Sequence, residues 1–446
     1  MGEVGETAGF DGGGAMRQKT LAHPPRMMTA FVFSPVPAMS TLLDRFLRYV
    51  AIDTMADERS TTYPSSPNQL VLGRMLKDEL LALGLADAVQ TEFGIVYATI
   101  PGNVPGAPTV AFVAHVDTSP ETTAKNVKPQ VIRNYAGGDL VLPGDPTKVI
   151  RTADNPELPK LVGKTIITTD GTTLLGADDK AGVAVIMELA KALVENPAVP
   201  HGPVRICFTC DEEIGKGVIH VDPKQLGADV AYTLDGAGTA EVEGETFSAD
   251  KATVSFRGVN IHPSIGKGRM VNAIKLAAKF LEKLPAESLS PETTEGREGF
   301  VHPYVIEGGV AEAKIHILLR DFDTPKLAEY AAMLKAAAAE AVAGEPRASF
   351  QIDIANQYRN MRDGMAKESR AVPFALEAVK RAGLTPKQTI IRGGTDGSRL
   401  TEMGLPTPNL STGEHNPHSP LEWTCLEEME DCVRVGVELV QVWTGR

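Results

Sequence analysis

The sequence is poor in cysteine, in aromatic residues and in positive charge. Its 446 residues include four cysteines, 5% aromatic residues, and 44 Lys and Arg against 57 Asp and Glu, which gives a net charge of -13. Four cysteines are too few for a disulfide scaffold in a chain of this length. Nucleic-acid phosphates call for a basic surface, so we expect no nucleic-acid partner.

Long apolar runs are missing as well. None approaches the ~20 residues that a helix needs to span a bilayer, so we expect no membrane partner. We interpret the four thiols as buried and unreactive, which suits a cytoplasmic location. Cys207 and Cys210 have the C-x-x-C spacing, but on the strand predicted there they point to opposite faces. A redox role is therefore the least favoured alternative.

The first 38 residues differ from the rest of the chain. Residues 1–18 are rich in glycine and have no apolar periodicity, and the short apolar run 27–33 leads into Pro35 and Pro37. We predict a disordered extension over residues 1–38, with Met39 as the native start. A signal peptide is the alternative.

Beyond residue 38, short apolar runs alternate with helical patterns. Residues 109–114, 204–209 and 230–234 have the continuous apolar character of strands that are covered on both faces. Residues 183–193 follow helical spacing. This alternation predicts an α/β fold with a mostly parallel sheet and helices on both faces.

The pattern changes near residue 248, where strands with one solvated face begin to alternate with two helical segments. Such a pattern predicts a compact α+β unit. We therefore predict a catalytic α/β domain that is interrupted by an inserted α+β lid domain. The boundaries are 39–247 and 356–446 for the catalytic domain and 248–355 for the lid domain.

Five short stretches carry metal-binding side chains next to predicted strand ends: His115–Asp117, Asp178–Asp179, Asp211–Glu213, Asp235 and His418. Taken singly, each has a plainer explanation as a polar turn, a helix cap or a solvated acidic loop. Together they supply two histidines and a surplus of carboxylates at the edge where parallel sheets form sites. That set is typical of two hydrolytic zinc ions that share one carboxylate, so the sequence predicts a dinuclear metallohydrolase.

Neighbouring candidates suggest different roles. Asp117 follows His115 by two residues and is a candidate for the carboxylate behind a ligating imidazole. In the pair Glu212–Glu213, one side chain can bind metal while the other acts as general base. One member of Asp178–Asp179 is available as the bridge between two ions.

From about residue 39 to the C-terminus, the sequence resembles the peptidase T family of co-catalytic zinc exopeptidases. The stretches that carry the resemblance are His115–Pro120, Lys125–Val127, Asn134–Asp139, Thr168–Gly171, Asp211–Gly217 and Arg392–Gly397. The resemblance assigns the zinc ligands as His115 and Asp235 for one ion, Glu213 and His418 for the other, and Asp178 as the bridge. It also implies that Glu212 is the general base and that Asp117 orients His115.

In the predicted lid domain, His262 and Arg320 resemble substrate-binding residues. The resemblance implies that they contact the scissile carbonyl and the C-terminal carboxylate of the peptide, for which Arg is suited by bidentate hydrogen bonding. The loop Gly413–His418 departs from the aromatic-flanked form that is usual in the family. His415 therefore stands as an alternative to His418.

The predicted function is hydrolysis of the N-terminal bond of short peptides, tripeptides first, by a zinc-bridged water with Glu212 as the base. The alternatives in the same zinc group are a dipeptidase, a carboxypeptidase and an N-acyl amino acid deacylase. A non-catalytic, metal-stabilised binding protein is the alternative from another class. Two Zn²⁺ are expected per chain, with Mn²⁺ or Co²⁺ as substitutes. A homodimer through the lid domain is one assembly that we consider.

Overall fold

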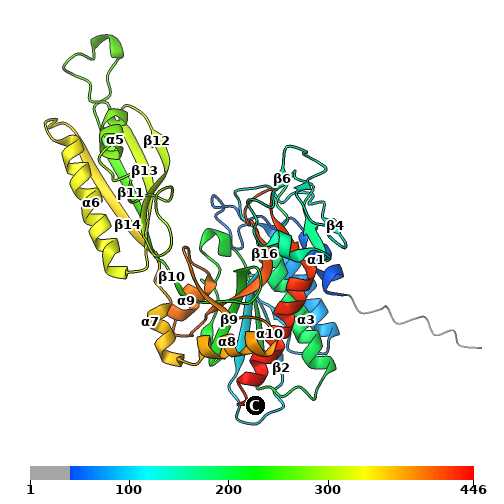
Figure 1. Cartoon of the computed structure of the whole chain (residues 1–446). Coiled ribbons are helices and arrows are strands. Elements are labelled where there is room, and N and C mark those ends of the chain that lie inside the picture. The colour runs from blue at the N-terminus through cyan, green and yellow to red at the C-terminus, as the bar shows by residue number, and fades with distance from the viewer. Residues whose placement is uncertain (1–40, 446) are drawn as a thin grey trace, which may run out of the picture. The chain divides into compact units, whose positions relative to one another are not determined.

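A computed structural model describes residues 41–445 of the chain (Figure 1). The predictions of a disordered extension over residues 1–38 and of a native start at Met39 concern residues outside this range. Within the described range, no helix is both long enough and apolar enough to cross a membrane.

The larger sheet has 11 strands among the described residues. Its centre is parallel, in the order β8 (Val204–Thr209), β3 (Val110–His115), β9 (Val230–Ala237) and β16 (Asn409–His415). Antiparallel strands extend it on both sides: β2 (Val96–Ile100) and β1 (Val89–Gln90) beyond β8, and β17 (Trp423–Cys425), β7 (Ile166–Thr168) and β4 (Gln130–Ile132) beyond β16. β10 (Glu241–Thr246) pairs with both β16 and β15 (Lys387–Ile391).

The predicted α/β class is confirmed, although the sheet is parallel only in part. Most of the outer antiparallel strands have two or three residues. Strands this short leave no readable apolar pattern in the sequence, because a period of two needs several residues to show.

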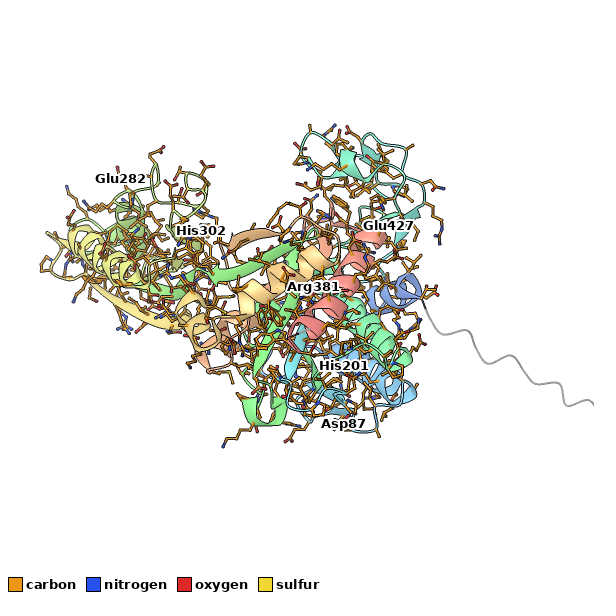
Figure 2. All side chains as sticks on the ribbon, turned by 60° about the horizontal axis from the view of Figure 1, so that its bottom comes forward. Asp87, His201, Glu282, His302, Arg381 and Glu427 are labelled. Carbon is orange, nitrogen blue, oxygen red and sulfur yellow. The ribbon has the colours of Figure 1, made fainter. Side chains whose placement is uncertain are left out.

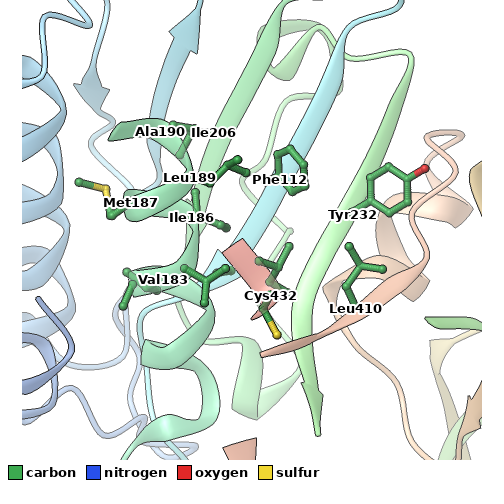
Figure 3. Close-up of a cluster of buried hydrophobic side chains, with 14 of the residues drawn as sticks. Phe112, Val183, Ile186, Met187, Leu189, Ala190, Ile206, Tyr232, Leu410 and Cys432 are labelled. Carbon is green, nitrogen blue, oxygen red and sulfur yellow. The ribbon is translucent and has the colours of Figure 1, made fainter. Parts of the chain in front are cut away.

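Hydrophobic clusters cover both faces of the larger sheet. Along β3, Phe112 belongs to one cluster and the adjacent Val113 to the other, which explains the continuous apolar run. The first face carries α1 (Leu42–Val50), α2 (Pro67–Ala82), α3 (Ala177–Glu195), α8 (Ala371–Arg381) and α10 (Leu426–Val442), and the second carries α4 (Pro223–Leu226) and α9 (Asp396–Glu402). Figure 3 shows Phe112 of β3 among α3 side chains such as Ile186 and Leu189.

The two cysteines of the C-x-x-C stretch are buried in different hydrophobic clusters of this sheet. Cys207 packs in the second cluster and Cys210 in the first, so the C-x-x-C spacing produces no redox pair. Burial raises the pKa of both thiols.

A side-chain hydrogen bond attaches α10 to the segment before β7. Glu427, at the start of α10 (Figure 2), accepts a hydrogen bond from the backbone N–H of Thr165 at 2.8 Å.

The smaller sheet is antiparallel, in the order β12 (Phe300–Gly308), β13 (Glu312–Asp321), β11 (Ser248–Arg257) and β14 (Ser349–Tyr358). Helices α5 (Ala273–Leu281) and α6 (Thr324–Val342) pack on one of its faces (Figure 1). Along β13, buried Ile317 and Leu319 alternate with half-buried Leu318 and Arg320. Arg320 therefore lies on the face opposite the helices.

Short elements connect the strands and helices. They are η1 (Leu158–Leu161), η2 (Glu212–Ile214), η3 (Pro263–Ile265), η4 (Ala366–Glu368), α7 (Arg362–Met365), β5 (Leu140–Val141) and β6 (Val149–Ile150). Of these, η2 matters most for function, since it carries two of the acidic residues singled out above.

Candidate active site

The predicted ligands meet around the carboxylate of Asp178. Its Oδ1 lies 3.0 Å from His115 Nε2, and its Oδ2 lies 3.1 Å from His418 Nε2. Asp235 Oδ1 approaches His115 Nε2 at 3.6 Å, and Glu213 Oε2 approaches His418 Nε2 at 3.0 Å. Asp178 thus faces both histidines with different oxygens, whereas Asp235 and Glu213 each face one.

His115 is placed by the parallel centre of the sheet. It ends β3, and its backbone N–H donates to Asp179 Oδ2 at 3.0 Å. Its Nδ1 lies 3.2 Å from the carbonyl oxygen of Asp117 and 3.4 Å from the Asp117 carboxylate. The ring is therefore fixed on one side, and Nε2 is directed towards the carboxylates.

Asp117 also holds the short helix η2. Its Oδ1 and Oδ2 accept hydrogen bonds from the backbone N–H groups of Glu212 and Glu213, both at 3.1 Å. A fully buried carboxylate with these two donors orients both glutamates relative to His115. The side chain predicted to orient the histidine therefore also orients the predicted base.

The residue before η2 is held from α2. Asp211 adopts a left-handed conformation with φ of 62°. Its carboxylate accepts from Gln69 Nε2 at 2.6 Å, and its own N–H donates to Gln69 Oε1 at 3.0 Å. The N–H of Ser65 adds a further bond at 2.6 Å. This reciprocal pairing fixes the turn that delivers Glu212 and Glu213.

The turn that contains Asp178 is held by Glu422. The carboxylate of Glu422, 1% exposed, accepts the N–H groups of Leu175, Gly176 and Asp178 at 2.7, 2.8 and 3.0 Å. Asp178 has non-helical dihedral angles within α3, so the regular part of the helix begins after Asp179. Glu422 thereby ties the segment after His418 to the residue between the two histidines.

His418 lies in the loop after β16. Its φ is 60°, its carbonyl oxygen accepts a hydrogen bond from Thr122 Oγ1 at 2.7 Å, and its Nδ1 lies 3.3 Å from Glu121 Oε2. His415, the alternative, points elsewhere: its Nε2 lies 2.8 Å from Glu428, and its ring stacks on Trp423 at 3.7 Å. The structure thus places His418, and not His415, beside Asp178.

The pKa values indicate a site that lacks positive charge. Burial raises the pKa of both Glu212 and Glu213, and neighbouring carboxylates add to the increase. Burial opposes the charged form of His418, yet Asp178 and Glu213 raise its pKa to about 12. Carboxylates that retain protons and imidazoles that retain charge both reflect an excess of buried negative charge.

Three further acids at the site were not assigned a role from the sequence. Asp179 can join His115 and Asp235 in one group of ligand atoms, and Glu414 can join Asp178 and Asp235 in another. Asp396, 5% exposed, accepts a hydrogen bond from Thr209 Oγ1 at 2.6 Å. Two of these acids could have been identified as candidates from their positions in the sequence. Glu414 precedes His415 in the C-terminal loop motif, and Asp396 lies in the stretch Arg392–Gly397.

The prediction that Asp235 ends a strand is wrong. β9 continues to Ala237, so Asp235 lies within the strand. Two residues of β9 beyond it pair with β16, in Gly236 with Ser411 and Ala237 with Glu414. The sequence could not show this extension, because its apolar run ends at Leu234.

The two predicted substrate-binding residues have local partners on the smaller sheet and its loops. His262 is exposed, and its Nδ1 lies 2.7 Å from Ser264 Oγ. Arg320 donates to Gln357 Oε1 at 2.8 Å and lies 5.2 Å from the centre of the Tyr358 ring. Among residues 41–445, no hydrogen bond or ion pair joins either residue to Asp178 or its neighbours.

Comparisons with known proteins identify similar peptidases. The family model for peptidase family M20/M25/M40 matches residues 170–442, and that for peptidase family M28 matches residues 96–237. The chain is similar to peptidase T of Geobacillus thermodenitrificans, with 44% identity over 90% of this chain and 98% of the relative.

Solved structures share the fold. A tripeptidase from Staphylococcus aureus matches with a TM-score of 0.71 and 23% identity, covering 91% of this chain and 98% of the other. A Bacillus subtilis protein described as a dinuclear metal-binding peptidase of the M20 family matches with a TM-score of 0.59 and 15% identity, covering 90% and 97%.

Proposed function

This chain belongs to the peptidase T family of the M20 peptidases, and from this premise we propose that it is a two-metal aminopeptidase of short peptides. It removes the N-terminal residue, with tripeptides as the main substrates. The observation that carries the proposal is the position of Asp178, whose two oxygens face His115 and His418 at 3.0 and 3.1 Å. A carboxylate between two imidazoles suits a bridge between two ions.

The residues present fit two divalent cations. His115, Asp178 and Asp235 would hold one ion, and Asp178, Glu213 and His418 the other. Glu213 Oε1 is buried and has no hydrogen-bond partner, so the site offers an unused carboxylate oxygen. A mixed set of imidazole and carboxylate ligands favours zinc, with manganese or cobalt as alternatives.

When bound, such ions polarise a carbonyl and lower the pKa of water. The remaining chemistry belongs to the side chains of the chain itself. Glu212 accepts a proton from the attacking water and delivers it to the amine nitrogen that leaves, as a general base and then a general acid. Its carboxylate belongs to none of the ligand groups around Asp178, and Asp117 holds its backbone at 3.1 Å. This leaves Glu212 free for proton transfer.

We assign recognition of the peptide to a lid domain over residues 248–355. His262 would donate to the oxyanion that forms at the scissile carbonyl. Arg320 would bind the C-terminal carboxylate of the peptide, for which its guanidinium is suited. Burial raises the pKa of Tyr358, whose charged neighbours are Arg320 and Glu212. The charges of both the proposed recognition residue and the proposed base therefore act on the Tyr358 hydroxyl.

Two further expectations concern the location of the enzyme in the cell and its oligomeric state. We keep a cytoplasmic location and a homodimer through residues 248–355 as predictions. Neither enters the chemical argument, because every proposed ligand and the proposed base come from one chain.

Hydrolysis of a matched peptide series tests the proposal. Di-, tri- and tetra-alanine, with N-acetylated and C-amidated tri-alanine, would be incubated with the Zn²⁺-loaded full chain, and the products identified by mass spectrometry. We expect tri-alanine with a free N-terminus to be cleaved fastest, with release of its first residue. Release of the C-terminal residue or of acetate would instead indicate a carboxypeptidase or a deacylase. A protein that binds two ions and cleaves none of these peptides would contradict the proposal.

A further inference from the structure

Glu414 is a buried carboxylate to which the proposed function gives no role. It is the second-last residue of β16 and is 4% exposed. Thr412 Oγ1 donates to its Oε2 at 3.1 Å, and its Oε1 has no hydrogen-bond partner within residues 41–445. The residues paired with it on the neighbouring strands, Ala237 and Thr424, carry no charge.

The carboxylate of Glu414 approaches two of the proposed ligands. One oxygen each from Asp178, Asp235 and Glu414 lie within 4.8 Å of one another. Three carboxylates at this spacing repel one another, and little water screens them, because the side chains of Asp178 and Asp235 are 11% and 13% exposed and Glu414 is 4% exposed. His115 contacts Asp178 and Asp235 at 3.0 and 3.6 Å, but no cationic side chain of the described residues pairs with Glu414. A cation bound between these carboxylates would remove this repulsion and replace the lost contacts with water.

A second observation points to the same ligand. Glu213 Oε1 has no hydrogen-bond partner although its side chain is only 5% exposed. Glu213 shares Asp178 with the group around Glu414. Each of the two ligand groups that contain Asp178 therefore includes a carboxylate oxygen without a hydrogen-bond partner, as expected where cations complete the site.

We propose that Glu414 is a further ligand of the divalent cation held by Asp178 and Asp235. The inference rests on the proposed metal centre. The backbone of Glu414 is fixed, because its carbonyl oxygen accepts the N–H of Gly238 at 2.9 Å and its strand pairs on both sides. This ion would have three carboxylates and the imidazole of His115. The other ion would have two carboxylates and one imidazole, so the two positions differ in charge.

The substitution Glu414→Gln tests the assignment, since it removes the charge but keeps the size and an acceptor for Thr412. The matched control is Glu243→Gln on β10, where a partly buried carboxylate accepts a hydrogen bond from Asn409 Nδ2 at 2.8 Å and belongs to none of the ligand groups. Zn²⁺ stoichiometry and affinity would be measured on the full chain by competition with a chelating indicator. Thermal unfolding would be followed with and without Zn²⁺.

We expect wild type to bind two Zn²⁺ and Glu414→Gln to bind one of them at least about tenfold more weakly. Glu243→Gln should bind both as wild type does. Without Zn²⁺, Glu414→Gln should have a higher Tm than wild type, because a repelling charge is gone. Added Zn²⁺ should then raise its Tm less than that of wild type.

Other outcomes overturn the assignment in distinguishable ways. A Tm lowered equally with and without Zn²⁺, at unchanged affinity, would indicate only the hydrogen bond to Thr412. Unchanged affinity for both ions would remove Glu414 alone from the ligands, whereas a wild type that binds no Zn²⁺ would remove the proposed function too. If Glu414→Gln does not fold, Glu414→Asp, which keeps the charge but is one methylene shorter, must show the weakened binding.

Discussion

The site on the larger sheet and the recognition residues assigned to the smaller sheet are held in different ways. Around Asp178, the backbone is fixed by buried carboxylates, such as Glu422 with its three N–H donors. His262, by contrast, is exposed and contacts Ser264, and Arg320 is held by Gln357. A preorganised site need not rearrange during the reaction, whereas exposed side chains adapt to a ligand. We therefore assign the chemical step to the first region and peptide recognition to the second.

Removal of the proposed base should have the largest effect. We expect Glu212→Gln to lower kcat by about 10²–10⁴-fold, because an amide cannot accept the proton of the attacking water, while both ions stay bound. Steady-state kinetics with tri-alanine, together with metal analysis, would measure this. The control is Glu340→Gln, an exposed carboxylate that pairs with Lys283 at 2.6 Å, which should keep most of the activity. Near-normal turnover of Glu212→Gln would rule out its role.

Loosening the turn at Asp178 should weaken metal binding. Glu422→Gln leaves one acceptor oxygen and places an amide donor against backbone N–H groups, so we expect Zn²⁺ affinity to fall by about 10–100-fold. Saturating Zn²⁺ should restore most of kcat. Glu428→Gln, which alters the partner of His415 away from the site, serves as the control. If titration of activity with Zn²⁺ gives the same midpoint for Glu422→Gln as for wild type, Glu422 does not position the ligands.

A change on the smaller sheet should instead affect recognition. Arg320→Ala should raise KM for free tri-alanine by about tenfold or more, since a charge-assisted hydrogen bond contributes about 1.5–3 kcal/mol. C-amidated tri-alanine lacks the carboxylate, so its kcat/KM should change little. An equal loss of kcat/KM for the two peptides would contradict the contact with the C-terminal carboxylate. It would also contradict the assignment of recognition to the smaller sheet.

The smallest effect is expected at Glu243, outside the ligand groups. Burial raises its pKa to about 7, so the folded state holds this proton between pH 4.5 and 7 while the unfolded state has released it. The free energy of unfolding therefore falls as pH rises through this window. At pH 8, metal-free Glu243→Gln should be more stable than metal-free wild type, by on the order of 1 kcal/mol. At pH 4 the difference should vanish in urea unfolding. A gain that is equal at both pH values would contradict the ionisation as its cause.

The sequence predicted the central strands and the residues at their ends better than it predicted the periphery. β3 and β8 are apolar on both faces, so their runs end visibly before His115 and Asp211. The strand β16 was missed, because Asn409–His415 is fully buried yet polar at most of its positions. Some of its side chains have partners distant in the chain: Asn409 Nδ2 donates to the carbonyl oxygen of Asp235 and to the carboxylate of Glu243.

The site was predicted in part for a related reason. Acidic and imidazole residues next to apolar runs gave the ligand candidates, and the family resemblance divided them into roles. Glu422 and Gln69 carried no comparable signal, since their function is to accept or donate hydrogen bonds to backbone far away in sequence. Such partners follow from the fold and not from local spacing. Glu414 was not identified as a candidate ligand, because β16 itself was not recognised as a strand.

The shared position of Asp178 between two ions is the central claim, and metal content tests it directly. Elemental mass spectrometry of purified full-length Asp178→Ala and Asp235→Ala, after equilibration with equal Zn²⁺, would compare a proposed bridge with a proposed ligand of one ion. We predict that Asp178→Ala loses both ions and that Asp235→Ala keeps one of them. Two ions retained in Asp178→Ala, or the same single loss in both variants, would contradict a shared carboxylate.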